Sequence, residues 1–184
     1  MAGRNKLLQP VRGVPVVRGV AIAALASKAN PVVVVTGHEA EEVGTALRGL
    51  DVTVVHNPRY AEGLSTSIAA GVRALPGDLH GALICLGDMP EICAAHLDAL
   101  IAAFAPEQGR SIIVPTHRGQ RGNPVLWAAS FFPELQQLTG DAGARHLLAH
   151  HREQVAEVAF ASDAVLIDVD TPEALARVQK AERE

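Results

Sequence analysis

The sequence predicts an α/β protein with a three-layer, mostly parallel, Rossmann-like sheet and a C-terminal β-hairpin and helical elaboration. Short apolar runs alternate with segments of helical periodicity over the first two-thirds of the chain, which is typical of parallel βαβ units. The run at 82–86 is wholly apolar, so we expect a strand that is buried on both faces of the sheet. A polar, glycine-rich turn at 116–124 separates two further apolar runs and indicates a hairpin.

The expected elements follow one another with short connections. Strands are expected at 32–36, 52–55, 82–86, 111–114, 125–127, 155–160 and 165–167. Helices are expected at 16–29, 39–48, from Ser65 or Ser67 to 75, and at 94–104, 131–138, 141–151 and from Pro172 onward, the last capped by Asp170 or Thr171. The opening residues 1–8 have no period and are expected to form a loop, so no strand leads into the first helix.

Length and composition limit the class of protein. A chain of 184 residues suits one domain over 1–184, and its 48% apolar residues are ample for a core. Aromatic residues make up only 3%, the net charge is −4 and no Lys/Arg cluster occurs, which argues against nucleic acid as a partner. No apolar run reaches membrane-spanning length, and no signal-peptide stretch opens the chain. We expect a soluble, cytoplasmic domain with no membrane partner.

The two cysteines, Cys85 and Cys93, have no metal-type spacing. We expect both to be small buried residues in a reducing compartment.

Asp88 is the first candidate for a functional residue. It follows the central apolar run directly after Gly87, and Pro90 stands two residues further on. In open α/β sheets ligands bind beyond the carboxyl ends of the strands. A carboxylate there suits Mg²⁺, which takes one or two carboxylates and leaves other positions to substrate phosphates. A helix N-cap also explains an Asp at a strand-to-helix turn, and for this residue taken alone the cap is the favoured interpretation.

Four polar loops should gather at the same edge of the sheet, at 36–38, 57–67, 87–88 and 115–123. Each taken alone has an ordinary explanation as a turn or a helix cap. The Gly and hydroxyl residues at 63–67 would also form a nest for a phosphate, because free N–H groups point outward at a helix N-terminus. The acids at 88, 141, 168 and 170 are more than capping requires.

Seven blocks of the sequence resemble the MobA-like nucleotidyltransferase family, and within it the molybdenum cofactor cytidylyltransferases. They lie at 5–8, 35–38, 57–67, 86–90, 121–126, 138–145 and 168–172, in the family's order. The resemblance implies a nucleotidyltransferase-type sheet. It also implies Mg²⁺-dependent transfer of CMP from CTP, or from another NTP, to the terminal phosphate of molybdopterin, with a molybdenum hydroxylase as the acceptor enzyme. In such phosphoryl chemistry the protein mainly positions groups and neutralises charge.

The resemblance also assigns roles to individual residues. Asp88 would bind Mg²⁺ with Asp168 or Asp170 as the second carboxylate, and Lys6 would neutralise phosphate charge, so Lys6 and Asp88 are the catalytic candidates. The nucleotide site would comprise Lys6, Thr36, Gly37, His38, Asn57, Gly63, Ser65, Ser67 and Asp88. The pterin substrate would lie toward Asn123, Asp141 and Arg145.

The chain departs from the family at its beginning. Family members start with a strand and a Gly-rich phosphate loop ahead of the block at 5–8, and Met1 falls where that loop has a Met. We expect either that the natural protein begins further upstream or that this is a genuine short form. Two further alternatives follow: a related transferase that uses GTP or a sugar-phosphate acceptor, and a non-catalytic protein that binds and delivers molybdopterin.

Overall fold

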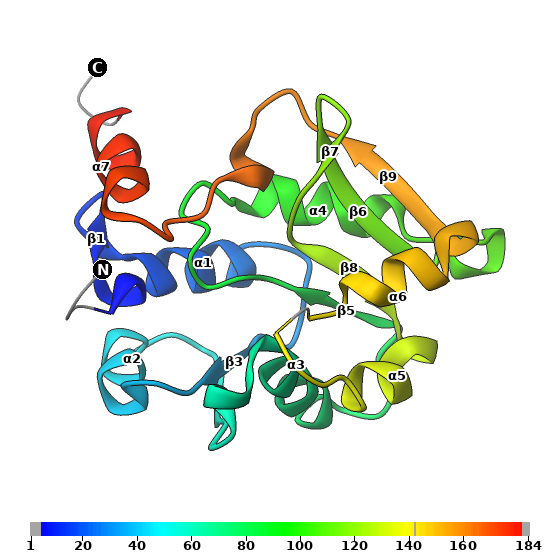
Figure 1. Ribbon diagram of the computed structural model, residues 1–184, viewed down its shortest axis with the longest axis horizontal. Coiled ribbons are helices and arrows are strands. Elements are labelled where there is room, and N and C mark those ends of the chain that lie inside the picture. The colour runs from blue at the N-terminus through cyan, green and yellow to red at the C-terminus, as the bar shows by residue number, and fades with distance from the viewer. Residues whose placement is uncertain (1–4, 142, 182–184) are drawn as a thin grey trace.

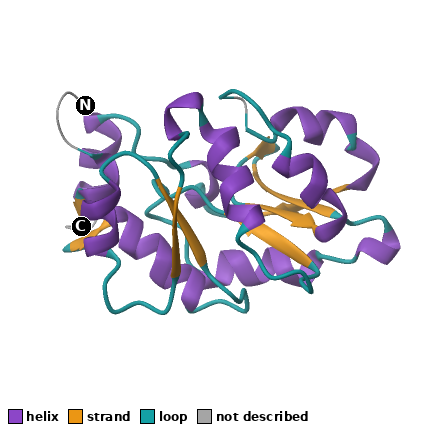
Figure 2. Cartoon of the chain, turned by 90° about the horizontal axis from the view of Figure 1, so that it is seen from below, coloured by secondary structure: helices purple, strands orange, loops and turns teal. Residues whose placement is uncertain are grey.

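The computed structural model describes residues 5–141 and 143–181. Of the loop expected at 1–8, residues 1–4 lie outside the described residues, whereas Lys6–Leu8 form a 3-10 helix, so the expectation is wrong there. Strands form a middle layer, and helices lie on either side of it (Figures 1 and 2). The expected α/β class and three-layer arrangement are therefore confirmed.

The first half of the chain alternates strands and helices. A 3-10 helix at Lys6–Leu8 precedes β1 (Pro10–Val11), β2 (Val14–Pro15), α1 (Val16–Leu25), β3 (Val33–Thr36), α2 (Ala40–Ala46), β4 (Thr53–His56) and α3 (Leu64–Arg73). The short antiparallel ladder of β1 and β2 was not predicted, because two-residue strands leave no periodicity to detect. Helix α1 ends four residues earlier than expected, where the Ser27 hydroxyl donates to the carbonyl of Ala24.

The second half builds the larger sheet. Its elements are β5 (Gly81–Ile84), α4 (Ala94–Ala103), β6 (Ile112–His117), β7 (Gln120–Arg121), β8 (Val125–Ala128), α5 (Phe132–Gln136), α6 (Arg145–His150), β9 (Val155–Ala159) and α7 (Pro172–Ala181). Among the described residues the strand order is β5-β8-β6-β7, and β9 pairs in parallel with β6. The expected hairpin is present, and its arm β8 lies antiparallel between β5 and β6.

Three local predictions are wrong. The expected strand at 165–167 is a 3-10 helix at Ala164–Leu166, since Asn123 N–H donates to the carbonyl of Val165 and no ladder forms there. Helix α3 has Gly63 as its N-cap and no side-chain cap, so neither Ser65 nor Ser67 caps it. The third concerns the cysteines: Cys93 is exposed and Cys85 is half-buried, although both are free thiols.

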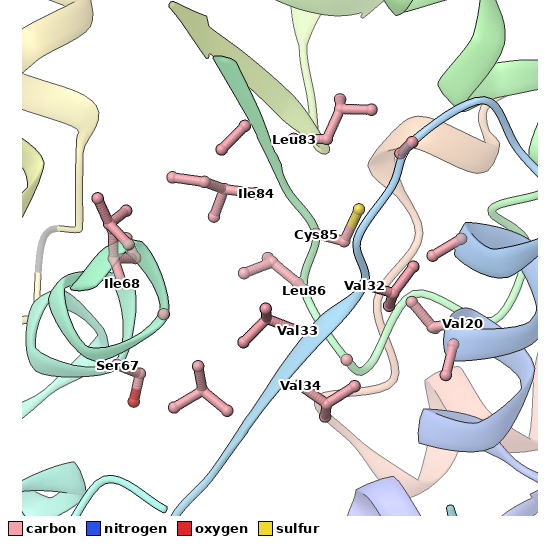
Figure 3. A pocket seen from close by; sticks show the side chains of 18 of the residues that line it. Val20, Val32, Val33, Val34, Ser67, Ile68, Leu83, Ile84, Cys85 and Leu86 are labelled. Atoms are coloured by element: carbon pink, nitrogen blue, oxygen red, sulfur yellow. The ribbon is translucent and has the colours of Figure 1, made fainter. Parts of the chain in front are cut away.

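The middle layer is divided between β3 and β5. Strand β3 pairs only with β4, and in the described part of the chain no ladder joins these two strands to the larger sheet. We call the gap the slot; it is lined by 32–35 of the β3 region and by 81–86 of the β5 region, and has a volume of about 670 Å³ (Figure 3). The residues of β5 are half-buried rather than buried on both faces, which corrects the prediction for 82–86.

The slot is partly open to solvent, so water can enter it, and its lining is mostly aliphatic. No helix among the described residues is both long enough and apolar enough to cross a bilayer.

Candidate active site

Lys6 is fixed by the short turn in which it lies. The side chain of Asn5 accepts a hydrogen bond from Leu7 N–H at 3.0 Å and so caps the 3-10 helix Lys6–Leu8. Leu7 and Leu8 pack against the cluster of Val17 and other residues on α1 and α2. The lysine is therefore held at the edge of the sheet between a capped backbone and an apolar anchor.

Two carboxylates converge on the Lys6 ammonium. Lys6 Nζ donates to Asp88 Oδ2 at 2.5 Å, and also to Asp170 Oδ1. A backbone hydrogen bond of 3.0 Å from Val169 N–H to the carbonyl of Asp88 holds the two acidic segments together. Val169 is fully buried in a cluster with Val16 and Leu175, so α1 and α7 fix the acidic loop from behind. The structure thus joins residues from the two ends of the chain in one site.

Asp88 does not cap a helix. The N-cap of α4 is Cys93, five residues further along the chain, so the capping alternative for Asp88 is wrong. Its Oδ2 is paired with Lys6, whereas its Oδ1 is buried and has no hydrogen-bond partner. Native proteins rarely leave a buried carboxylate oxygen without a partner, so this atom needs a donor or a cation.

The charges of the cluster shift two pKa values. Burial raises the pKa of Asp168, and the neighbouring charges of Asp170 and Asp88 raise it further. Burial lowers the pKa of Lys6, but hydrogen bonds to Asp170 and Asp88, together with their charges, outweigh this and leave it above its ordinary value of 10.5. Three carboxylates near one ammonium leave excess negative charge, which a further cation would neutralise.

The site fits a hard divalent cation with few protein ligands. No group of three or more His, Cys, Asp or Glu in the described ranges 5–141 and 143–181 is arranged to hold a metal ion. Asp88 and Asp170 nevertheless share one positive charge, and Asp88 Oδ1 is an unused oxygen ligand. Mg²⁺ commonly takes one or two carboxylates and completes its shell with water and phosphate, so this donor set suits it.

A second cluster ties the end of β4 to α3. Asn57 is buried, and its amide donates to Thr66 Oγ1 at 2.9 Å and to Ser67 Oγ at 3.1 Å. Its Oδ1 accepts from Arg59 N–H at 3.0 Å, and its backbone N–H donates to the carbonyl of Thr36. The Asn57 side chain is therefore fully engaged within the protein, and it shapes the loop on which any nucleotide would rest.

A third cluster lies at the N-terminus of α3. Ser65 N–H donates to the carbonyl of Gly140, and the Ser65 hydroxyl donates to the carbonyl of Thr139 at 3.2 Å. Gly63 has φ 107°, and a Cβ there would lie 2.1 Å from Asp141 Oδ1. The 139–141 segment thus sits directly on the first turn of α3, and Asp141 lies over Gly63.

The remaining candidates lie at the periphery of these clusters. His38 is exposed beside Glu39, and a Cβ on Gly37 would lie 2.4 Å from Tyr60 Cβ. Asn123 is held through its backbone by Val165, and Arg145 is an exposed residue that begins α6. Within residues 5–141 and 143–181, no hydrogen bond or ion pair joins these side chains to Lys6 or Asp88.

Two supporting residues were missed by the sequence reasoning. Val169 holds the acidic loop against Asp88, and Tyr60 closes over Gly37. Val169 stands between two acids, and a lone apolar residue in an acidic segment was the available signal. Tyr60 is the one tyrosine of the chain and carries no signal beyond its position in the 57–60 block.

Comparison with known proteins identifies one family model and several relatives that are similar to this chain. The family model described as MobA-like NTP transferase domain matches residues 1–155. Purine catabolism protein PucB of Bacillus subtilis is 33% identical over 188 residues, which cover 97% of this chain and 90% of that protein. Molybdenum cofactor cytidylyltransferase of Escherichia coli is 27% identical over 143 residues, which cover 77% of this chain and 70% of that protein.

A solved structure shares the fold along nearly the whole chain. The crystal structure of Rv0371C from Mycobacterium tuberculosis, in complex with manganese, superposes with a TM-score of 0.80 and 28% identity. The superposition covers 97% of this chain and 94% of that one. The expected nucleotidyltransferase type of α/β sheet is therefore confirmed.

Proposed function

Because this chain belongs to the MobA-like NTP transferase family, we propose that it transfers CMP from CTP to the terminal phosphate of molybdopterin and releases pyrophosphate. In this reaction a phosphate oxygen of the acceptor attacks the α-phosphorus of CTP, and the bond from that phosphorus to the oxygen of the departing pyrophosphate breaks. The observation that carries the proposal is the convergence of Asp88, Asp170 and Lys6 at the carboxyl edge of the strands.

Lys6 has the most direct role in this proposal. Its ammonium keeps its proton, since its pKa lies above the ordinary value, so it stays a cation at every physiological pH. Contact with the triphosphate would let Lys6 offset the charge that develops on the departing pyrophosphate. Asp88 and Asp170 orient the ammonium through two hydrogen bonds and prevent it from rotating freely.

Asp88 and Asp170 would also hold Mg²⁺. Between the two candidates for the second carboxylate we favour Asp170, because it accepts a hydrogen bond from Lys6, which Asp88 also accepts. A bound Mg²⁺ would neutralise charge on the triphosphate. Asp168, whose pKa is raised by burial and by its acidic neighbours, adds to the negative potential that attracts the cation.

The nucleotide and the acceptor are assigned to different parts of the edge. We place the nucleotide along Thr36–His38 and the loop that Asn57 shapes, because both lie at the carboxyl ends of β3 and β4. The acceptor is placed toward Asn123 and the 141–145 segment. Asp141 and Arg145 are both exposed, and their side chains are available to a polar ligand.

The names of the two relatives suggest where the product goes. One relative is named for purine catabolism and the other for cytidylyl transfer to the molybdenum cofactor. A molybdenum hydroxylase that acts on purines would connect both names, and we propose such an enzyme as the acceptor of the product. GTP or a sugar phosphate as substrate remains the competing proposal, which a comparison of substrates decides.

The test measures pyrophosphate release with CTP, GTP, molybdopterin and Mg²⁺ in all pairings. We expect release only when CTP and molybdopterin are both present. Asp88→Asn should reduce turnover by about 10²–10³-fold, the usual effect of removing one group that stabilises transition-state charge. The matched control is Asp78→Asn, an exposed Asp in a turn remote from the cluster, which should keep full turnover. Full turnover by Asp88→Asn would refute its role.

A second readout separates binding from chemistry. Titration with Mn²⁺, followed by paramagnetic relaxation of water, should show weaker binding for Asp88→Asn and unchanged binding for Asp78→Asn. Preferential turnover of GTP would refute the proposed nucleotide. Binding of molybdopterin with no NTP-dependent thermal shift would instead favour the non-catalytic delivery protein.

A further inference from the structure

The Lys6 ammonium lies on oxygens of the two acids that would hold the metal ion. Lys6 Nζ donates to Asp88 Oδ2 at 2.5 Å and also to Asp170 Oδ1. The other oxygen of Asp88, Oδ1, is buried. A hydrated cation from solvent therefore reaches this carboxylate through Oδ2, and there it meets the lysine.

The charges of the cluster favour a divalent cation but not beside the ammonium. Asp88, Asp168 and Asp170 carry three negative charges when ionised, and Lys6 carries one positive charge. Two negative charges are left over, which a divalent cation would balance. An ammonium on the same oxygens would lie next to that cation, and like charges repel strongly at such short range. Both cations fit the site only if the ammonium moves off the shared oxygens.

The lysine can move while its backbone stays in place. Asn5 caps the 3-10 helix Lys6–Leu8, and the two leucines of this helix pack in an apolar cluster. The Lys6 side chain is 34% exposed, and its four-carbon stem is flexible. The acidic loop is less free, because Val169 N–H donates to the carbonyl of Asp88 and Val169 is fully buried. Entry of a cation should therefore displace the ammonium rather than the acids.

The slot offers the displaced ammonium no other carboxylate. Lys6 lines the slot together with Thr36 and Gly37, the end of β3 along which we place the nucleotide. None of the described residues that line the slot is acidic. An ammonium that turns toward this side would therefore take its anion from the substrate, and the phosphates of a nucleotide supply one.

We propose that Lys6 is an exchangeable cation of the acidic pair. It holds Asp88 and Asp170 together until a divalent cation takes their oxygens, and its ammonium then moves off the carboxylates toward the phosphates of the nucleotide. This inference rests on the proposed function, because it assumes a metal ion on the two acids and a triphosphate beside them. It adds an order of events: Lys6 contacts phosphate only after the metal ion has bound.

The first test follows the lysine itself in the parent chain, so it does not depend on the folding of a variant. The chain has three lysines, and the proton–nitrogen NMR signal of the Lys6 ammonium is assigned by its loss in Lys6→Gln. Titration with Mg²⁺ alone, without nucleotide, should shift this signal until it saturates. The signal of Lys28, an exposed lysine, should stay in place and is the internal control.

The second test measures Mn²⁺ affinity by water relaxation. Lys6→Gln should bind Mn²⁺ about tenfold more tightly than the parent chain, the gain expected if the ammonium covers the acids about nine-tenths of the time. Lys6→Arg should bind several-fold more weakly, because a guanidinium pairs with carboxylates through a rigid fork and is harder to displace. Lys28→Gln removes the same charge elsewhere and should leave the affinity unchanged.

Three outcomes would overturn the proposal. A Lys6 signal that stays in place while Mn²⁺ binds in an Asp88-dependent manner would overturn it and leave the proposed function standing. Equal Mn²⁺ affinity of Lys6→Arg and the parent chain would also overturn it alone, because charge repulsion without displacement predicts that equality. Metal binding that is the same in Asp88→Asn and the parent chain would refute the metal site of the proposed function, and this proposal with it.

Discussion

Substitution of Gly63 by alanine tests how tightly the 139–141 segment holds the N-terminus of α3. Gly63 has φ 107° and ψ 173°, a region that side-chain-bearing residues adopt at a cost of about 1–3 kcal/mol. The new Cβ would also lie 2.1 Å from Asp141 Oδ1 and 2.7 Å from the carbonyl oxygen of Gly140. Asp141 is exposed and can rotate away, but the Gly140 backbone must move.

Movement of that backbone has a defined cost. Gly140 accepts from Ser65 N–H, and the adjacent Thr139 accepts from the Ser65 hydroxyl. Loss of both hydrogen bonds removes about 1 kcal/mol each. Together with the backbone strain, Gly63→Ala should lower the free energy of unfolding by about 3–5 kcal/mol.

Urea denaturation followed by Trp127 fluorescence measures this change, because Trp127 is the single tryptophan and is buried in the larger core. The matched control is Gly49→Ala: Gly49 has φ 81°, and a Cβ there meets nothing within 4 Å. The control should lose only the backbone term of about 1–2 kcal/mol. Equal losses in the two variants would refute the reasoning, because the contact with 139–141 would then contribute nothing.

Three further predictions concern single side chains. Asn57→Ala should lower the free energy of unfolding by about 3 kcal/mol in urea titrations, because three hydrogen bonds of a buried amide are lost; a loss below 1 kcal/mol would contradict this. Asp168→Asn should stabilise the fold at pH 7 by roughly 0.2–1 kcal/mol, since it removes a repelled carboxylate. Because the pKa of Asp168 is raised in the folded state, its ionised carboxylate destabilises the fold at pH values above that pKa. The stabilisation by Asp168→Asn should therefore shrink as the pH falls toward 3.8, and a stabilisation that grows with acidity would contradict this reasoning. The exposed Cys93 should react with a thiol reagent at pH 8 before Cys85, because burial raises the pKa of Cys85 to about 12, and Cys93→Ser should abolish the fast phase.

The alternation of elements could be predicted from sequence because each apolar run has its own local period. The valine run before Thr36 became a strand at the expected place, and the run at 82–86 became a strand that ends two residues early, at Ile84. The hairpin arm at 125–127 was also predicted, but its place between β5 and β6 was not. Strand order depends on which edges meet in space, and a short apolar run carries no information about its neighbours.

The sequence predicted the residues of the candidate site better than it predicted the hydrogen bonds between them. Asp88 could be selected as an acid that follows a strand, whereas Lys6 and the pair of alternatives Asp168 and Asp170 were assigned by their resemblance to family blocks. The sharing of Lys6 by both acids could not be predicted, because it depends on Val169 being buried against α1 and α7. Ser65 and Ser67 do not cap α3 as predicted, for a similar reason. The Ser65 hydroxyl donates to the carbonyl of Thr139, and the Ser67 hydroxyl accepts from the Asn57 amide, and neither partner could be identified from the sequence.

The Lys6–Asp170 ion pair has a consequence for the order in which the protein folds. Its two residues are separated by 164 positions, so the contact closes almost the entire chain into one loop. Such distant contacts form late in folding, because the entropy of closing the loop must be overcome before the contact stabilises anything. During synthesis Asp88 is completed long before Asp170 leaves the ribosome, and the nascent chain carries an unfinished acidic centre. The Lys6–Asp170 contact, and with it the proposed metal site, would therefore be completed only when the C-terminal segment docks.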